Sequence, residues 1–141
     1  MQNPRLLVLD DQVQYGRSLE RVLRKEYRVV LANSLVHAQS LMSAGYIDLV
    51  VTDIRLDETN QDDRQGIAFI QWLRERDVGI PIISISAIDD SQLERDALQA
   101  GATRFLHKPI RVSQLKKTLH QVLLNVEEPI DGWTEDKDSS D

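Results

Sequence analysis

The sequence contains no cysteine, which excludes disulfide bonds, thiolate nucleophiles and cysteine-ligated zinc. It also lacks any apolar run near the roughly 18–20 residues that a membrane span needs, and its N-terminus shows no signal-peptide pattern. Excess positive charge is missing too: the formal net charge is −6, which argues against nonspecific binding to nucleic acid. With 141 residues, 41% of them hydrophobic, the chain is predicted to form one cytoplasmic globular domain.

The negative charge is concentrated at the end of the chain. Residues 127–141 hold seven acids and one lysine, whereas residues 1–126 hold 16 acids and 16 bases. The terminal segment shows no apolar periodicity. We therefore expect residues 1–126 to form the domain and residues 127–141 to be a disordered tail or the start of a linker. The chain is then either complete in one domain or a fragment of a longer protein.

Short apolar runs alternate with amphipathic helical patterns through the body of the chain. The runs are rich in Val, Ile and Leu, which predicts strands buried on both faces of a parallel sheet. They span residues 5–9, 27–31, 48–52, 82–85 and 103–106. Between and after them, apolar residues recur every three or four positions, as in amphipathic helices: Leu19, Val22 and Leu23; Leu35, Ala38 and Leu41; Ile67, Ile70 and Leu73; Leu93, Ala97 and Ala100; Leu115, Leu119, Val122, Leu123 and Val126. This alternation predicts a doubly wound α/β domain.

Polar side chains follow four of the five runs, at the points where the strands are expected to end. They are Asp10, Asp11, Asp53, Ser86 and Lys108. Any one of them alone also fits a helix cap or a solvated surface group. Because the carboxyl ends of such strands meet at the ligand site, we expect the five side chains to converge. Clustered carboxylates suit Mg²⁺, and a carboxylate nucleophile beside a metal, a hydroxyl and an ammonium group suits phosphoryl transfer.

Four segments of the sequence resemble the receiver domain of two-component response regulators. They are LLVLDDQ (6–12), DLVVTDIRL (48–56), IISISA (82–87) and AGATRFLHKP (100–109), and the resemblance covers about residues 4–126. It implies a flavodoxin-like doubly wound parallel sheet of five strands in the order 2-1-3-4-5, with five helices. It also implies a signalling phosphoprotein that catalyses only its own phosphotransfer and dephosphorylation.

The resemblance assigns a phosphoacceptor and a magnesium site. Asp53 would accept a phosphoryl group from the phosphohistidine of a histidine kinase, as an aspartyl phosphate. Asp10, Asp11 and Asp53 would hold Mg²⁺, and the backbone carbonyl of Arg55 would complete the protein ligands.

The resemblance also assigns a conformational switch. Ser86 and Lys108 would each bind an oxygen of the phosphoryl group. An inward movement of Ser86 would vacate space for Phe105, although Phe105 also fits an ordinary core aromatic residue. The surface formed by the fourth helix, fifth strand and fifth helix would then change and signal to a partner. The Lys108–Pro109 peptide matches a position that is typically cis in the family.

Three departures from the family pattern stand out. Ser86 replaces the commoner Thr, and Phe105 lacks the hydroxyl of Tyr. A glycine usually follows the phosphoacceptor by about eight positions, whereas Gly66 follows Asp53 by thirteen. The intervening residues 57–65 (DETNQDDRQ) hold four acids and one arginine, with Asp57 in place of the usual proline. This loop fits either a harmless surface insertion or a partner-specificity loop.

Two positions of this family vary widely and modulate the lifetime of the phosphoryl group. In this chain they are Arg55 and Ile88. Our hypothesis is that these long or bulky side chains hinder the attacking water and lengthen that lifetime.

The resemblance implies a sensor histidine kinase or phosphotransfer protein as donor, and a downstream protein or an attached output domain as receiver of the signal. The segment itself is expected to bind neither nucleic acid nor membrane, and a homodimer through the last helix stays open. Three other functions compete. A degenerate receiver would have lost an acid, Asp53 or Lys108. A phosphohydrolase would want a second acid where Arg55 stands. An FMN binder would not place Asp10 and Asp11 after its first strand.

Overall fold

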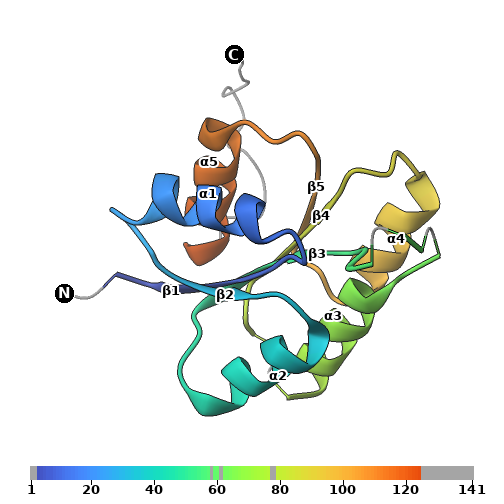
Figure 1. The fold of residues 1–141 in the computed structure, drawn as a ribbon, viewed down its shortest axis with the longest axis horizontal. Coiled ribbons are helices and arrows are strands. Elements are labelled where there is room, and N and C mark those ends of the chain that lie inside the picture. The colour runs from blue at the N-terminus through green and yellow to red at the C-terminus, as the bar shows by residue number, and fades with distance from the viewer. Residues whose placement is uncertain (1–2, 58, 61, 77–78, 125–141) are drawn as a thin grey trace.

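A parallel sheet flanked by helices forms the part of the chain that the structure describes, residues 3–57, 59–60, 62–76 and 79–124 of a computed structural model (Figure 1). The strands are β1 (Arg5–Leu9), β2 (Arg28–Ala32), β3 (Leu49–Asp53), β4 (Ile82–Ser86) and β5 (Arg104–His107). The helices are α1 (Val13–Leu23), α2 (Leu35–Ala44), α3 (Gln65–Arg76), α4 (Ser91–Ala100) and α5 (Val112–Leu123). The predicted domain end at residue 126 and the acidic segment 127–141 lie outside the described residues.

The strand order is β2-β1-β3-β4-β5 and every neighbouring pair is parallel, which confirms the predicted topology. Helices α1 and α5 cover one face of the sheet, and α2, α3 and α4 cover the other (Figure 1). The chain reverses its direction of winding between β1 and β3, so the switch point lies beside the carboxyl ends of these two strands.

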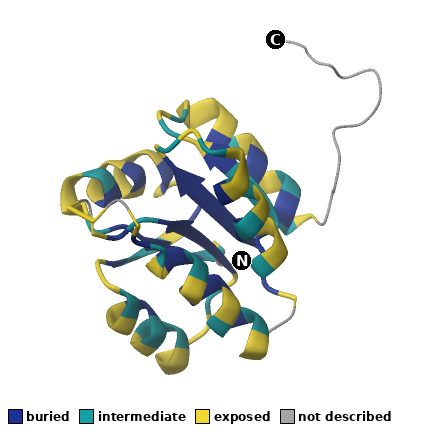
Figure 2. Cartoon of the chain, turned by 90° about the vertical axis from the view of Figure 1, so that its right-hand side faces the viewer, coloured by how far each residue is buried: buried dark blue, intermediate teal, exposed yellow. Residues whose placement is uncertain are grey.

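The two hydrophobic layers explain why the strand sequences are almost wholly apolar. Along β1, Leu7 and Leu9 pack under α2 to α4, whereas Leu6 and Val8 pack under α1 and α5. All residues of β3 and β4 are buried (Figure 2). A central strand covered on both faces has no solvent-facing side, so its sequence does not alternate between apolar and polar residues.

The observed strands differ from the predicted runs by about one residue. Strands β2, β3 and β5 begin and end one residue later than expected, so Asp53 and His107 are the last residues of their strands. The residues are polar, yet their backbones continue the ladder: Asp53 pairs with Ile85, and Ser86 pairs with His107. Apolar character therefore marked the strand interiors but not their ends.

Local sequence features account for the start of α2, the end of α4 and the buried face of α1. Ser34 caps α2, accepting a hydrogen bond from the His37 N–H at 3.2 Å. Gly101 ends α4 with φ of 125°, a left-handed conformation that favours glycine. Of the apolar residues predicted to share one face of α1, Leu19 and Leu23 are buried, whereas Val22 is 37% exposed. The buried stripe of α1 is narrower and consists of Gly16, Leu19 and Leu23.

None of the helices in the described ranges combines the length and the apolar character that crossing a membrane requires.

Candidate functional site

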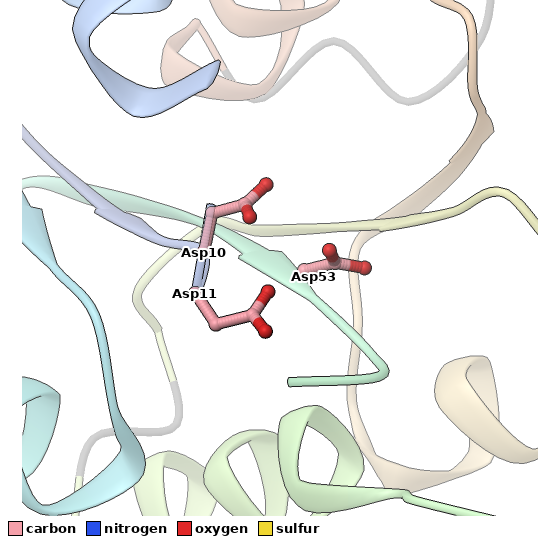
Figure 3. Close-up of side chains that lie close together, drawn as sticks. All are labelled: Asp10, Asp11 and Asp53. Carbon is pink, nitrogen blue, oxygen red and sulfur yellow. The ribbon is translucent and has the colours of Figure 1, made fainter. Parts of the chain in front are cut away.

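Three carboxylates gather at the carboxyl edge of the sheet, beside the switch point. Asp10 and Asp11 directly follow β1, and Asp53 ends β3 (Figure 3). Asp10 is 6% exposed and Asp53 5% exposed. One oxygen atom from each of the three residues lies within 4.8 Å of the corresponding atoms of the other two. The strand order brings these acids together although 42 residues separate Asp11 from Asp53 in the sequence.

Lys108 joins the cluster from the loop after β5. Its ammonium Nζ donates hydrogen bonds to Asp53 Oδ2 at 3.0 Å and to Asp10 Oδ2 at 3.2 Å. Burial alone would lower the pKa of Lys108, but the neighbouring charges of Asp53 and Asp10, and their hydrogen bonds, raise it above its ordinary value. Lys108 is therefore a partly buried cation that neutralises part of the acidic cluster.

The donor set fits a hard divalent cation. Carboxylate oxygens are the ligands that Mg²⁺ prefers, and opposite ligands of an octahedral Mg²⁺ lie about 4 Å apart. Adjacent ligands lie about 3 Å apart, so the oxygens of Asp10, Asp11 and Asp53, which lie within 4.8 Å of one another, would move closer together around such an ion. Asp11 interacts with other parts of the chain, but its Oδ1 atom is buried and accepts no hydrogen bond from the described residues.

A small cavity adjoins the cluster on the β4 side. Its volume is about 20 Å³, and its lining consists of Asp53, Arg55, Ser86, Ala87, Ile88 and Lys108. Ser86 is 1% exposed, and its hydroxyl oxygen accepts a hydrogen bond from the Ile88 N–H at 3.0 Å. The carboxylate, the hydroxyl and the ammonium group that the sequence predicted thus share one cavity. Arg55 and Ile88 lie at the same cavity.

Phe105 lies apart from this cavity on β5. It pairs with Ser84 on β4 and packs half-buried against the core under α2 to α4. Its ring meets the His107 ring edge-on, with 5.0 Å between the ring centroids. Because side chains two residues apart on a strand point to the same face, Ser84 and Ser86 face the side that Phe105 faces. The Lys108–Pro109 peptide that follows is cis, as the resemblance implied.

Two residues that touch the site were missed by the sequence argument. The Lys108 ammonium lies 4.5 Å from the ring centroid of Tyr15 on α1, a cation–π contact. Burial raises the pKa of Tyr15, with Lys108 acting in the opposite direction and Asp10 and Asp53 adding to the rise. Asp63 lies in the loop that the sequence indicated as a surface insertion or a partner-specificity loop, yet it is only 7% exposed. In the sequence, only its place three residues before Gly66, just ahead of the third helix, pointed to a structural role for Asp63.

Gly66 brings the start of α3 against the backbone of the site. A Cβ atom at this position would lie 2.0 Å from the Asp53 carbonyl oxygen and 2.5 Å from the Ile54 Cα. The Gly66 N–H also donates to the Ile54 carbonyl at 2.8 Å. Despite its later place in the sequence, Gly66 therefore occupies the position where helix and strand backbones approach most closely.

Comparison with known proteins shows what the chain resembles. Residues 6–120 match the family model described as the response regulator receiver domain. Over 124 residues the chain is 32% identical to the transcriptional regulatory protein ZraR of Salmonella typhimurium, a match that covers 87% of this chain and 27% of that protein. It is 36% identical over 115 residues to the alginate biosynthesis transcriptional regulatory protein AlgB of Pseudomonas syringae, covering 79% of this chain and 24% of that protein.

The fold has close structural relatives. A response regulator receiver domain protein (CheY-like) from Methanospirillum hungatei matches with a TM-score of 0.80 and 20% sequence identity, covering 89% of this chain and 98% of that one. At this identity the likeness concerns the fold. The matched part of the chain spans about a quarter of the length of the curated relatives.

Proposed function

The chain belongs to the response regulator receiver domain family of two-component systems, and on that premise we propose that it accepts a phosphoryl group on Asp53 from a phosphohistidine. The observation that carries this proposal is the pairing of Asp53 with Lys108 at 3.0 Å, in a cluster that also holds the buried Asp10 and the half-buried Asp11. Apart from Asp10 and Asp11, these residues lie far from one another in the sequence, and the fold brings them together.

In the proposed reaction, a carboxylate oxygen of Asp53 attacks the phosphorus atom of the phosphohistidine. A P–O bond forms as the P–N bond breaks, and the electron pair returns to the imidazole, which takes up a proton from solvent. Asp10, Asp11, Asp53 and the Arg55 carbonyl would hold Mg²⁺, which when bound offsets the negative charge on the transferring oxygens. The protein would act only on its own phosphorylation and dephosphorylation.

Lys108 and Ser86 are the groups that would recognise the aspartyl phosphate. Phosphorylation adds about 1.5–2 negative charges and three acceptor oxygens. The Lys108 ammonium already lies beside Asp53 and would transfer a hydrogen bond to a phosphoryl oxygen. The Ser86 hydroxyl lines the same cavity and can donate its own proton while accepting from Ile88.

The signal would leave through the surface formed by α4, β5 and α5. Movement of Ser86 toward the phosphoryl group would give Phe105 room on the same face of the sheet. On this surface the His107 ring Nε2 lies 3.7 Å from a carboxylate oxygen of Glu94, between β5 and α4. It also carries apolar side chains that a partner could cover, Leu98 and Val112, which are 42% and 41% exposed. A downstream protein or an attached output domain would bind this surface.

The proposed donor is a sensor histidine kinase or a phosphotransfer protein. The curated relatives are named as transcriptional regulatory proteins about four times the length of the matched segment. An output domain attached to the natural protein is therefore the favoured receiver of the signal, while the segment itself would not bind nucleic acid.

Intact mass spectrometry tests the proposal. The protein is incubated with acetyl phosphate in Mg²⁺, in EDTA, and as the isosteric variant Asp53→Asn in Mg²⁺. We expect the mass of one added phosphoryl group in the first sample and none in the other two. If no adduct forms in Mg²⁺, and none forms with a histidine kinase as donor, the protein is a degenerate receiver that binds partners without phosphorylation.

A further inference from the structure

The buried carboxylate of Asp63 holds the backbone that follows Asp53. Its Oδ2 atom accepts hydrogen bonds from the Leu56 N–H at 2.5 Å and the Asp57 N–H at 2.7 Å. Its Oδ1 atom accepts from the Gln65 N–H at 3.3 Å, at the start of α3. The acid therefore links both ends of the long loop between β3 and α3.

These hydrogen bonds fix the orientation of one peptide group in particular. The Leu56 N–H belongs to the same planar unit as the Arg55 carbonyl. Among the described residues the Lys108–Pro109 bond is the one cis peptide, so the Arg55–Leu56 unit is trans. In a trans peptide the N–H and the C=O point in opposite directions. Holding the Leu56 N–H toward Asp63 therefore directs the Arg55 carbonyl away from Asp63.

The neighbouring backbone is anchored independently on the strand side. The Ile54 N–H donates to the Ile85 carbonyl at 3.1 Å, and the Gly66 N–H donates to the Ile54 carbonyl at 2.8 Å. Ile54 is thus fixed to β4 and to α3, whereas Leu56 and Asp57 are fixed by Asp63. Arg55 lies between the two anchors, so its peptide groups have little freedom to rotate.

The hydrogen bond to a carboxylate also affects the carbonyl electronically. A negatively charged acceptor polarises the amide that donates to it, and the polarisation increases the negative charge on the carbonyl oxygen of the same peptide. A more negative oxygen is a better ligand for a hard cation. Asp63 is suited to hold this charge: burial raises its pKa, but the hydrogen bonds from Asp57, the Gln65 side chain, Leu56 and the Gln65 backbone outweigh burial and lower the pKa below its ordinary value.

We propose that Asp63 is a positioning residue of the magnesium site, which orients and polarises the Arg55 carbonyl without contacting the ion. This inference rests on the proposed function, because it takes the Arg55 carbonyl as a ligand. It gives the loop after β3 a role, because the extra residues between Asp53 and Gly66 bring a carboxylate back to the backbone at Leu56 and Asp57. Residues that orient ligands typically change metal affinity by about 10–100-fold when removed.

Calorimetric titration with Mg²⁺ tests the inference on the full chain. Four proteins are compared: the wild type, Asp63→Ala, Asp63→Asn and Asp62→Ala. Asp62 is the matched control, because it is an exposed acid next to Asp63. Circular dichroism sets a temperature at which all four are folded. Asp63→Ala is expected to weaken Mg²⁺ binding about tenfold or more. Asp63→Asn keeps an oxygen acceptor without the charge, so its Mg²⁺ affinity should lie between those of Asp63→Ala and the wild type. The Mg²⁺ affinity of Asp62→Ala should stay within about twofold of the wild-type value.

A second readout separates ligand positioning from general stability. On addition of Mg²⁺ to wild-type protein, the carbonyl ¹³C resonance of Arg55 is expected to shift, and this shift should shrink in Asp63→Ala even at saturating metal. Should Asp63→Ala fail to fold, Asp63→Asn carries both measurements. Wild-type affinity and shift in the folded Asp63 variants, or an equal loss in Asp62→Ala, would overturn the inference while leaving the magnesium site in place. Absence of Mg²⁺ binding by the wild type would instead overturn the proposed site itself.

Discussion

At the scale of single residues, Lys108 supplies the positive charge that lies directly against Asp10 and Asp53. It is 16% exposed and lies between two acids that are almost fully buried. Repulsion between Asp10 and Asp53 is offset by this one ammonium group in the described structure. The ring of Tyr15 covers another side of the ammonium group. The ammonium group therefore offsets part of the repulsion between these acids without a metal ion.

Replacing Lys108 by an uncharged residue should change both the stability of the protein and its response to Mg²⁺. We predict that Lys108→Met lowers the free energy of unfolding by about 3 kcal/mol in EDTA, because two buried carboxylates lose their cation. Mg²⁺ should then stabilise the variant more than the wild type. Urea titrations with EDTA and with Mg²⁺ measure both effects. Lys116→Met is the control, since it removes an exposed ion pair with Glu26 that contributes about 1 kcal/mol at most. Equal stabilisation of Lys108→Met and wild type by Mg²⁺ would contradict the account.

The lifetime of the aspartyl phosphate should depend on Arg55 and Ile88. Both line the cavity shared by Asp53, Ser86 and Lys108, which is where an attacking water would enter. We predict that Ile88→Glu combined with Arg55→Asn speeds dephosphorylation by about tenfold or more. The gain should stay below the roughly 100-fold rate increase that a well-placed general base gives. Loss of the phosphoryl adduct is followed by intact mass after the donor is removed. An unchanged or slower rate would refute the hypothesis that these side chains hinder water.

At the scale of secondary-structure elements, the start of α3 lies against the backbone at the end of β3, at Gly66. We predict that Gly66→Ala lowers the free energy of unfolding by about 3 kcal/mol, because the new Cβ would meet backbone atoms that cannot move aside. Gly45→Ala is the matched control, since the nearest atom to its Cβ is the end of the Arg5 side chain at 3.5 Å. Chemical denaturation of both variants compares them. Equal free energies of unfolding for the two variants would show that the backbones of β3 and α3 can move apart to accept a Cβ atom at position 66.

The same elements show why the sequence predicted some features and not others. The alternation of apolar runs and helical stripes was enough to predict a doubly wound parallel sheet, because parallel strands covered on both faces have a recognisable composition. The strand order itself was implied by the resemblance to the receiver family. Asp10, Asp53, Ser86 and Lys108 were found because each follows or ends a strand at the edge where ligands bind. The predicted strand ends differ from the observed ones by one residue, because a polar residue can continue the strand through its backbone hydrogen bonds.

Asp63 and Tyr15 were not found, for a different reason. Their roles depend on where a loop folds back and how a helix is rotated, and neither is encoded by the residue type or its spacing. In the sequence, Asp63 is one of four acids in residues 57–65. Only the structure separates it from the exposed Asp62 beside it. The assigned roles of Asp53, Ser86, Phe105 and the magnesium ligands stay predictions until chemistry tests them.

At the scale of the whole molecule, stability at high pH should fall partly through Tyr27. This residue is 6% exposed in the core layer under α1 and α5. Burial, with a smaller effect of the Glu26 charge, raises its pKa above the ordinary value of 10.0. A folded-state pKa above the unfolded value gives stability that is complete below pH 10 and is lost as pH rises through the folded pKa, at up to about 1.4 kcal/mol per pH unit.

We therefore predict that Tyr27→Phe flattens this loss. The free energy of unfolding is measured between about pH 8 and pH 11, the range that brackets ordinary tyrosine titration. The variant should lose less stability across that range than the wild type. Tyr46→Phe serves as the control because Tyr46 is 88% exposed. Parallel curves for wild type and Tyr27→Phe would show that Tyr27 does not contribute to alkaline unfolding.

We propose that the fold places one reactive carboxylate, that of Asp53, beside a cation site and a lysine. The most direct test of this role for Asp53 is to locate the phosphoryl group after transfer from a histidine kinase in Mg²⁺. Borohydride reduces an aspartyl phosphate to homoserine, and tandem mass spectrometry of the digest then identifies the modified residue. The account predicts homoserine at position 53 and nowhere else. Homoserine at another acid, or unmodified Asp53 beside an active kinase, would contradict it.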